Sequence, residues 1–218
     1  MKVNDYKIIY YYSFNDECYL ARIPDLPGCI SDGKTIAEAI TNVRELARDW
    51  IDITSDYGED IPLPSCLEYP SGEELHINDV AAYILERLGD ITTKFLQKLL
   101  YYCNAWSFGW YHKALFPESF EAWAGGPVNK GLFSKHQHML IAQKNLFADD
   151  DVQELSKSQK EFVDLIVDLY DDFDPDVLGE MTHVEAPWTI ARDGCPQGEK
   201  CTNVISEDSM IDYYGQAS

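Results

Sequence analysis

The apolar pattern of residues 36–51 constrains the fold more than any other feature of the sequence. Seven apolar residues recur there at helical spacing: Ile36, Ala39, Ile40, Val43, Ala47, Trp50 and Ile51. Residues at this spacing share one face of a helix. Thr35 followed by Glu38 has the pattern of a capping box, which stabilises the start of a helix. The sequence therefore predicts an amphipathic helix here.

Short strands precede this helix. Residues 7–13 and 18–23 are rich in β-branched and aromatic residues and are joined by a polar stretch, which is typical of a hairpin. Prolines and a glycine interrupt residues 24–29, and a third short strand is expected at 29–31. After the helix, Pro62 and Pro64 would confine the chain to a short edge strand or an extended arm. Residues 1–66 thus predict a β-β-β-α-β domain.

The pattern changes after residue 66. Residues 67–76 contain Pro, Ser and Gly without an apolar period and are predicted to be a linker. Helical patterns follow at residues 78–88, 92–103, 132–145 and 156–169, with shorter ones at 175–181, 187–192 and 206–214. We therefore predict an α+β protein in which a small N-terminal domain is followed by a mostly α-helical domain, residues 77–218. No internal repeat is found.

The charge balance argues against nucleic acid as a partner. The formal net charge is −21, whereas affinity for nucleic acid comes largely from lysine and arginine. Between Asp149 and Glu180 the chain has twelve acidic residues and two lysines. This balance is compatible with a basic protein partner or with an acidic surface that only keeps the chain soluble.

Neither a membrane span nor a signal peptide is predicted, because no apolar stretch approaches about 18 residues and the N-terminus lacks a basic start and an apolar middle. We expect a cytoplasmic protein. Its six cysteines are scattered without a CxxC pair, so neither a zinc site nor a disulfide framework is indicated. Cys195 and Cys201 are expected to be reduced.

The glycine-rich stretch 121–133, EAWAGGPVNKGLF, could cradle a phosphate or shape the chain. A phosphate loop needs a lysine directly after its last glycine and a preceding strand, but here Lys130 precedes Gly131. A structural turn is favoured, with Gly125 and Gly126 allowing the bend, Pro127 fixing its direction and Trp123 packing across it.

Catalytic and metal-binding groups are not indicated. The acidic residues of the first domain lie in turns where aspartate is common: Asp5, Asp16, Glu17, Asp25 and Asp32. His136 and His138 would point away from each other on a helix, and His183 is expected to make a local hydrogen bond. Lys98, between apolar neighbours, is expected either to extend along its helix to solvent or to pair with a carboxylate.

Aromatic residues are concentrated at 101–111, where Tyr101 and Trp106 belong to a run of six rings. Most such rings form a core, although some could be exposed and anchor a protein interface.

Two stretches resemble known families. Residues 7–65, with PDLPGC at 24–29, a Gly-x-Thr and a Glu-Ala pair, resemble the HicB-like antitoxin domain, which implies a degraded RNase H-like fold without the nuclease carboxylates. Residues 77–214, with ITTKFLQKLLYYCNAW, EAWAGGPV and MTHVEAPW, resemble the Panacea domain, a SocA-like, phage-associated antitoxin domain.

The resemblance implies an antitoxin that neutralises its cognate toxin by direct protein contact and is not an enzyme. The toxin is expected to have a basic surface, and a homodimer through the HicB-like domain is possible. The alternative is an adaptor that delivers a bound toxin to a protease. Direct operator binding is not expected, since the Panacea domain replaces the DNA-binding segment. No cofactor is implied.

Ten residues are candidates for partner contact or belong to the matching motifs. They are Lys98, Tyr101, Trp106, Trp123, Gly126, Pro127, His183, Trp188, Asp25 and Pro27.

Overall fold

The structure is a computed structural model that describes residues 2–217. The chain folds into two compact units. Unit 1 extends to Glu68 and includes Gln216 and Ala217, and unit 2 is Tyr69–Gly215. Each unit is described by itself below.

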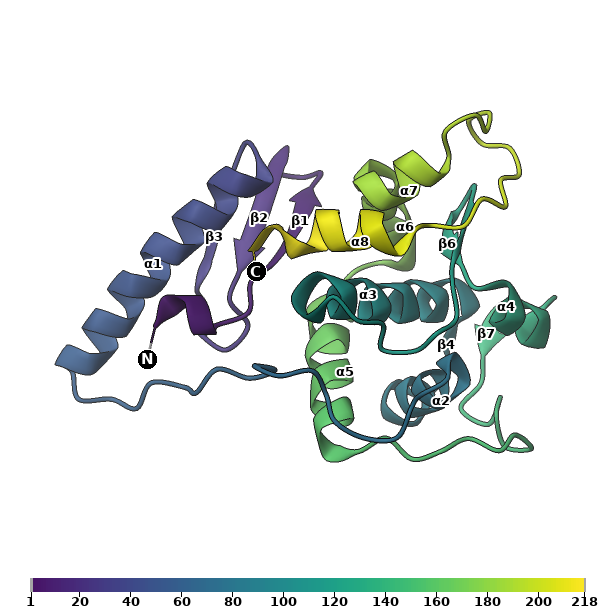
Figure 1. Cartoon of the computed structure of the whole chain (residues 1–218), viewed down its shortest axis with the longest axis horizontal. Coiled ribbons are helices and arrows are strands. Elements are labelled where there is room, and N and C mark those ends of the chain that lie inside the picture. The colour runs from purple at the N-terminus through teal and green to yellow at the C-terminus, as the bar shows by residue number, and fades with distance from the viewer. Residues whose placement is uncertain (1, 218) are drawn as a thin grey trace. The chain divides into compact units, whose positions relative to one another are not determined.

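Unit 1 is a three-stranded antiparallel sheet followed by one long helix (Figure 1). Its elements are η1 (Val3–Asp5), β1 (Ile9–Ser13), β2 (Cys18–Arg22), β3 (Ile30–Gly33) and α1 (Ile36–Asp56). The strand order is β1-β2-β3, and the register pairs Tyr11 with Leu20 and Ala21 with Ser31. The predicted α+β class, with three strands before the helix, is confirmed.

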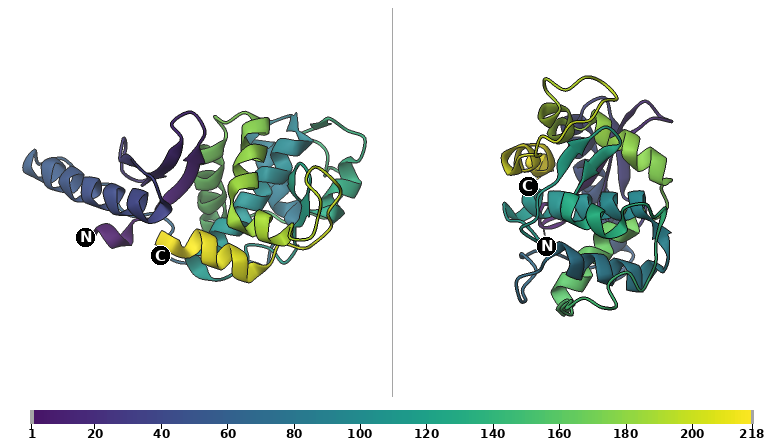
Figure 2. Two further views of the ribbon diagram at one scale, coloured as in Figure 1. Left: turned by 90° about the horizontal axis from the view of Figure 1, so that it is seen from above. Right: turned by 90° about the vertical axis from the view of Figure 1, so that its right-hand side faces the viewer.

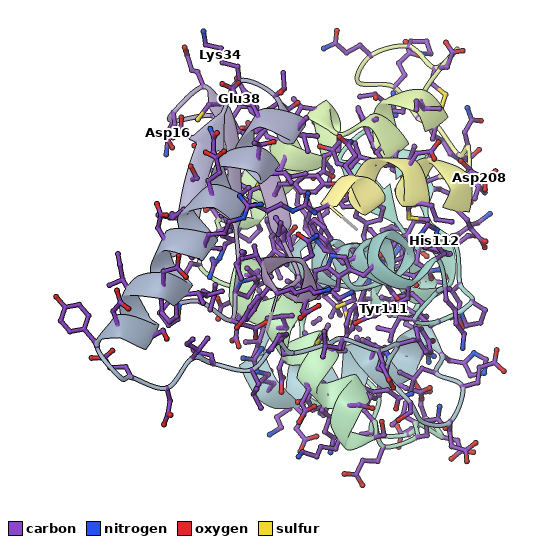
Figure 3. All side chains as sticks on the ribbon, turned by 60° about the vertical axis from the view of Figure 1, so that its left-hand side comes forward. Asp16, Lys34, Glu38, Tyr111, His112 and Asp208 are labelled. Carbon is purple, nitrogen blue, oxygen red and sulfur yellow. A yellow bond between two sulfur atoms is a disulfide. The ribbon has the colours of Figure 1, made fainter. Side chains whose placement is uncertain are left out.

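The start of α1 follows the sequence signal. The Thr35 hydroxyl accepts a hydrogen bond from the Glu38 backbone N–H at 3.1 Å, and the Glu38 carboxylate accepts one from the Lys34 N–H at 2.8 Å. Figure 3 shows Lys34 and Glu38 at the same end of unit 1 as Asp16 in the β1–β2 turn. Five of the predicted apolar residues are buried: Ile36, Ala39, Ile40, Val43 and Ala47.

The strand predicted after the helix is not formed in the described part of unit 1, and this part of the β-β-β-α-β prediction is wrong. Residues 59–65 run as an extended arm, because Pro62 and Pro64 cannot donate to a sheet. Two hydrogen bonds fix the arm: the Tyr6 hydroxyl donates to the Pro62 carbonyl at 2.7 Å, and the Ser65 N–H donates to the Asp25 carboxylate at 3.1 Å.

Unit 2 is mostly helical, as predicted. Its helices are α2 (Ile77–Leu88), α3 (Thr93–Tyr111), α4 (Lys130–His136), α5 (Lys157–Tyr170), α6 (Pro175–Val184), α7 (Ala186–Ala191) and α8 (Glu207–Tyr214), and η2 (Gly215–Ala217) follows. Its short strands are β4 (Ile91–Thr92), β5 (Glu121–Trp123), β6 (Gly126–Val128) and β7 (Ile141–Ala142).

Helix α3 is the centre of unit 2. Every residue from Phe95 to Trp110 is buried, and α3 contacts α2, α5, α6, α8 and β6. Figure 1 shows α3 with α8 on one side of it and α5 and α2 on the other. A helix buried on all sides must place its polar side chains in the core as well.

The helix predicted over residues 132–145 is wrong beyond His136. Helix α4 ends there, His138 has a left-handed backbone with φ of 70°, and β7 pairs with β4 through Ile91 and Ala142. The apolar residues 139–142 matched a helical period, but two of them form a strand because β4 offers a partner.

Residues 69–76, predicted as a linker, make several hydrogen bonds to the rest of unit 2. The Tyr69 hydroxyl donates to the Ala114 carbonyl at 2.8 Å, and the Gln159 side chain donates to the Glu73 carbonyl at 2.9 Å.

No helix between residues 2 and 217 is both long and apolar enough to cross a membrane.

Gly33 tests the packing of β3 against α1. A Cβ at this position would lie 2.3 Å from the Ala39 backbone nitrogen and 2.9 Å from its Cα. Because the backbone cannot move aside cheaply, we expect Gly33→Ala to lower the free energy of unfolding of unit 1 by about 1–3 kcal/mol. Urea denaturation followed by the NMR signal of the Trp50 indole N–H, which belongs to the only tryptophan of unit 1, measures this.

The matched control is Asp32→Ala, an exposed side chain on the same strand, which should change stability by less than about 0.5 kcal/mol. Equal effects of the two substitutions would show that β3 does not pack closely on α1.

Candidate partner-binding site

The stretch EAWAGGPV is a small β-hairpin. Strands β5 and β6 pair through Glu121 with Val128 and Trp123 with Gly126. On the other side of β5, the Ala122 N–H donates to the Asn203 carbonyl at 2.9 Å, and Val204 forms a bridge with Glu121. The stretch predicted as a structural turn is thus a two-stranded hairpin, and its strand β5 also contacts residues 203–204.

Lys98 of α3 holds this hairpin from the core. Its side chain is 1% exposed, and its Nζ donates to the Pro127 carbonyl oxygen at 2.9 Å. Burial lowers the pKa of Lys98 to about 7, with Lys94 as a second cause. Neither predicted alternative is found: Lys98 does not reach solvent, and within residues 2–217 it forms no ion pair.

Gly126 makes the approach of Lys98 possible. Its φ is +101°, and a Cβ there would lie 2.7 Å from the Lys98 Nζ and 2.8 Å from the Thr182 hydroxyl. Gly125, next to it at the tip of the hairpin, has open space where its Cβ would be. The two adjacent glycines therefore have different roles.

Gln97 adds a second link between α3 and the hairpin. Its Oε1 accepts from the Asn129 N–H at 2.8 Å, and its Nε2 donates to the Asn129 carbonyl at 3.2 Å. The Asn129 side chain in turn accepts from the Leu132 N–H and caps α4. Sequence reasoning missed both residues, although an amide in an otherwise apolar helix indicates a specific buried partner.

The two tryptophans of the matching motifs meet beside the hairpin. The Trp188 indole N–H donates to the Trp123 carbonyl at 3.0 Å, and the Trp123 ring packs edge-on against Phe133. The His183 imidazole stacks on Trp188 with ring centres 4.3 Å apart. Residues of α6, α7 and the hairpin tip here line a cavity of about 450 Å³.

His183 does not make the local hydrogen bond that was predicted. Its Nε2 is buried and has no hydrogen-bond partner within residues 2–217. Burial lowers the pKa of His183, and Lys98, Lys94 and Arg192 lower it further. The imidazole is therefore neutral near pH 7 and acts through stacking.

Cys195 and Cys201 form a disulfide, so their predicted reduced state is wrong for this structure. The Arg192 guanidinium binds the loop between the two cysteines, donating to the carbonyls of Pro196 at 2.7 Å and Glu199 at 3.0 Å. It also donates to the Ala122 carbonyl of β5 at 2.9 Å. The spacing of the two cysteines alone did not indicate this pairing.

Tyr101 and Trp106 are in the core and cannot contact a partner, because both are 0% exposed. The Trp106 indole donates to the Tyr170 hydroxyl at 2.9 Å. Of the two readings given for them, Tyr101 and Trp106 are therefore buried motif residues and not partner contacts.

Glu185, which sequence reasoning also missed, lies between α6 and α7 and is 3% exposed. The hydroxyls of Tyr102 and Tyr214 donate to its carboxyl oxygens at 3.1 and 2.7 Å. Burial raises the pKa of Glu185 to about 8, although both hydrogen bonds oppose the shift. These bonds tie α3, α8 and the α6–α7 junction together.

The remaining candidates lie in unit 1. Asp25 accepts from the Ser65 N–H, as described above, and the Pro27 carbonyl accepts from the Trp50 indole N–H at 3.2 Å. The PDLPGC motif therefore connects the arm and the C-terminal half of α1. Asp25 and Pro27 belong to unit 1, whereas the other candidates belong to unit 2.

The described residues, 2–217, contain no group of three His, Cys, Asp or Glu side chains that could hold a metal ion. What the hairpin cluster can do chemically is limited by its bonding: Lys98, Arg192 and both indoles already donate to carbonyls or carboxylates. The cluster is a rigid support with a cavity at its side.

Comparisons with known proteins assign both parts of the chain to antitoxins. Residues 6–88 match the model of the HicB-like antitoxin of bacterial toxin–antitoxin systems, and residues 96–189 match the SocA-like antitoxin, Panacea domain. The first match includes α2, which lies in unit 2. The chain therefore contains a HicB-like antitoxin domain in its N-terminal part and a SocA-like Panacea domain in its C-terminal part, and the recognition from sequence is confirmed.

A curated protein is similar to a short part of the chain. UPF0150 protein Ta0767 of Thermoplasma acidophilum is 40% identical over 47 residues, which are 22% of this chain and 68% of the relative. No solved structure matches the chain significantly.

The two glycines of the hairpin give a matched pair of substitutions. We expect Gly126→Ala to lower the free energy of unfolding of unit 2 by about 2 kcal/mol or more, because the new methyl group meets Lys98 and Thr182 and the backbone is left-handed. Gly125→Ala should change stability by less than about 0.5 kcal/mol. Urea denaturation of both variants decides this, and equal stabilities would contradict the Lys98 contact.

Glu185 should make stability depend on pH. Its pKa is about 8 in the folded chain against an ordinary value of 4.5, so between these values the unfolded chain loses a proton that the folded chain keeps. The contribution of Glu185 to stability therefore falls as pH rises through this window, by up to about 1.4 kcal/mol per pH unit.

Glu185→Gln removes this titration, so the variant should gain stability relative to the unmodified chain as pH rises from 5 to 8. Thermal denaturation at several pH values measures the difference. Glu180→Gln, an exposed position on α6, is the control and should show no trend. A difference independent of pH for Glu185→Gln would mean that this carboxyl is ionised throughout.

Proposed function

We propose that this protein neutralises a cognate toxin by binding it directly, without chemical modification of the toxin. The single observation that carries the proposal is the presence of two antitoxin domains of different families in one chain. The matching motif residues of unit 2 are bonded to one another as a support, which fits binding better than catalysis.

The acidic surface suits a basic toxin. Several carboxylates between Asp149 and Glu180 form ion pairs within unit 2, such as Asp150 with Lys135 and Asp176 with Lys94. Asp171 and Asp172, at the end of α5, are exposed and form no ion pair within the described residues. Unpaired charges of one sign speed the encounter with a partner of opposite charge.

We propose that unit 2 makes the contact with the toxin. We further propose that the protein acts in the cytoplasm and does not bind nucleic acid directly. A homodimer through unit 1 stays a prediction.

Co-expression with the protein encoded beside this chain tests the proposal. We expect growth rescue and a complex that elutes as one peak in gel filtration, and we expect rescue to persist in a strain that lacks the host protease. A toxin that stays active and elutes alone would refute direct neutralisation. Rescue that disappears without the protease would show delivery for degradation.

Removal of charges from the acidic surface of unit 2 tests whether this surface contacts the toxin. Asp171→Asn combined with Asp172→Asn should weaken the complex about tenfold and flatten its dependence on salt. Asp16→Asn combined with Glu17→Gln, the same charge change at the β1–β2 turn, is the matched control. A stronger effect in the control than in the test pair would move the contact to unit 1.

A further inference from the structure

Helix α1 carries an apolar stripe that the core of unit 1 does not use. Leu46, Trp50, Ile53 and the C-cap residue Tyr57 are spaced by four, three and four residues, so they lie along one side of the helix and its end. Leu46 is 38% exposed, Ile53 57% and Tyr57 79%, while Trp50 is half-buried. Figures 1 and 2 show the C-terminal turns of α1 running past the strands.

This stripe is more than scattered exposed residues. Single apolar side chains on a surface are ordinary, but a continuous row over three turns of helix is the arrangement with which helices bind other helices. Residues that fill the core of unit 1 occupy the neighbouring face of the same helix, from Ile36 to Ala47. The stripe continues this apolar surface beyond the sheet.

An acidic stripe runs parallel to the apolar one. Each of the four residues is directly preceded by a carboxylate: Glu45, Asp49, Asp52 and Asp56. All four are exposed, and none forms an ion pair within the described residues. Because one residue corresponds to about 100° of rotation, these carboxylates flank the apolar row along one side.

The negative charge beside the apolar stripe favours a basic partner over a second copy of this chain. In an antiparallel pair of identical helices, the same flank of each helix faces the other, so a second copy of α1 would set carboxylate against carboxylate. A helix with an apolar face and lysine or arginine beside it would bury the stripe and neutralise the flank at once.

We propose that the α1 stripe, defined as Leu46, Trp50, Ile53 and Tyr57, is a docking surface for a basic amphipathic helix of a partner protein. Trp50 also donates to the Pro27 carbonyl, so the stripe is fixed to the PDLPGC motif and is preorganised for binding. This surface is separate from the unit 2 contact assigned above, and its test does not depend on the toxin.

The probe is a synthetic leucine–lysine peptide of about 18 residues, or roughly five turns, with the leucines on one helix face. A peptide of the same composition without an apolar face is the control. We expect the first peptide to bind the full-length chain and to shift the NMR signal of the Trp50 indole N–H, assigned with Trp50→Phe. Equal binding of both peptides would overturn the proposal.

Ile53→Asp should weaken the binding of the amphipathic peptide by at least about tenfold. Leu140→Asp, at a residue of unit 2 that is 85% exposed, is the matched control and should leave binding unchanged. Circular dichroism checks that both variants fold. Equal weakening in both variants would show that the peptide binds the acidic chain without using α1.

Asp49→Asn combined with Asp56→Asn should weaken binding and reduce its dependence on salt, and the Asp16→Asn, Glu17→Gln pair should not. Sedimentation of the chain alone tests the other occupant. A dimer that Ile53→Asp converts to a monomer would assign the stripe to a second copy and overturn the proposal.

Discussion

The burial of α3 from Phe95 to Trp110 is the constraint on which unit 2 depends. Polar groups removed from water must find partners within the protein, and α3 meets this requirement by bonding to segments distant in sequence. Lys98 holds Pro127, Gln97 holds Asn129, and Asn104 accepts from the N–H groups of Leu115 and Phe116. Each polar side chain of α3 thereby positions a different segment, so the helix organises the unit as well as filling its core.

Burial in the core also changes which ionisable groups carry a charge. Lys98 has its pKa lowered to about 7 and Glu185 has its pKa raised to about 8, so both can be neutral at physiological pH in a chain of net charge −21. Isolated ions in the core would be far more costly than these neutral forms. The charges that a partner meets therefore belong to exposed carboxylates, and the motif residues around Lys98 support the surface from below.

The sequence predicted correctly those features that depend on contacts between residues close together in the chain. Thr35 with Glu38 and Ser156 with Gln159 cap helices as predicted, because each bond joins residues three apart. One prediction failed because a distant partner decides: residues 141–142 form β7 because β4 pairs with them. Two others failed at short range: Cys195 and Cys201 form a disulfide that their spacing does not indicate, and His183 stacks on Trp188 in place of a hydrogen bond. Lys98 and the glycine pair were noticed as motifs, but their contact joins residues 28 apart and has no local signature.

The two kinds of surface on this chain act at different stages of binding. Exposed carboxylates mainly raise the rate of encounter with a basic partner, and salt weakens this effect. Apolar contacts such as those that the α1 stripe can make are not screened by salt and mainly lengthen the life of a complex. Unit 2 has exposed carboxylates that form no ion pair within the described residues, whereas α1 has a row of carboxylates directly beside a row of apolar side chains. A partner with a basic amphipathic helix would gain both effects at α1, which gives a physical reason for keeping unit 1 in a chain whose unit 2 is already an antitoxin domain.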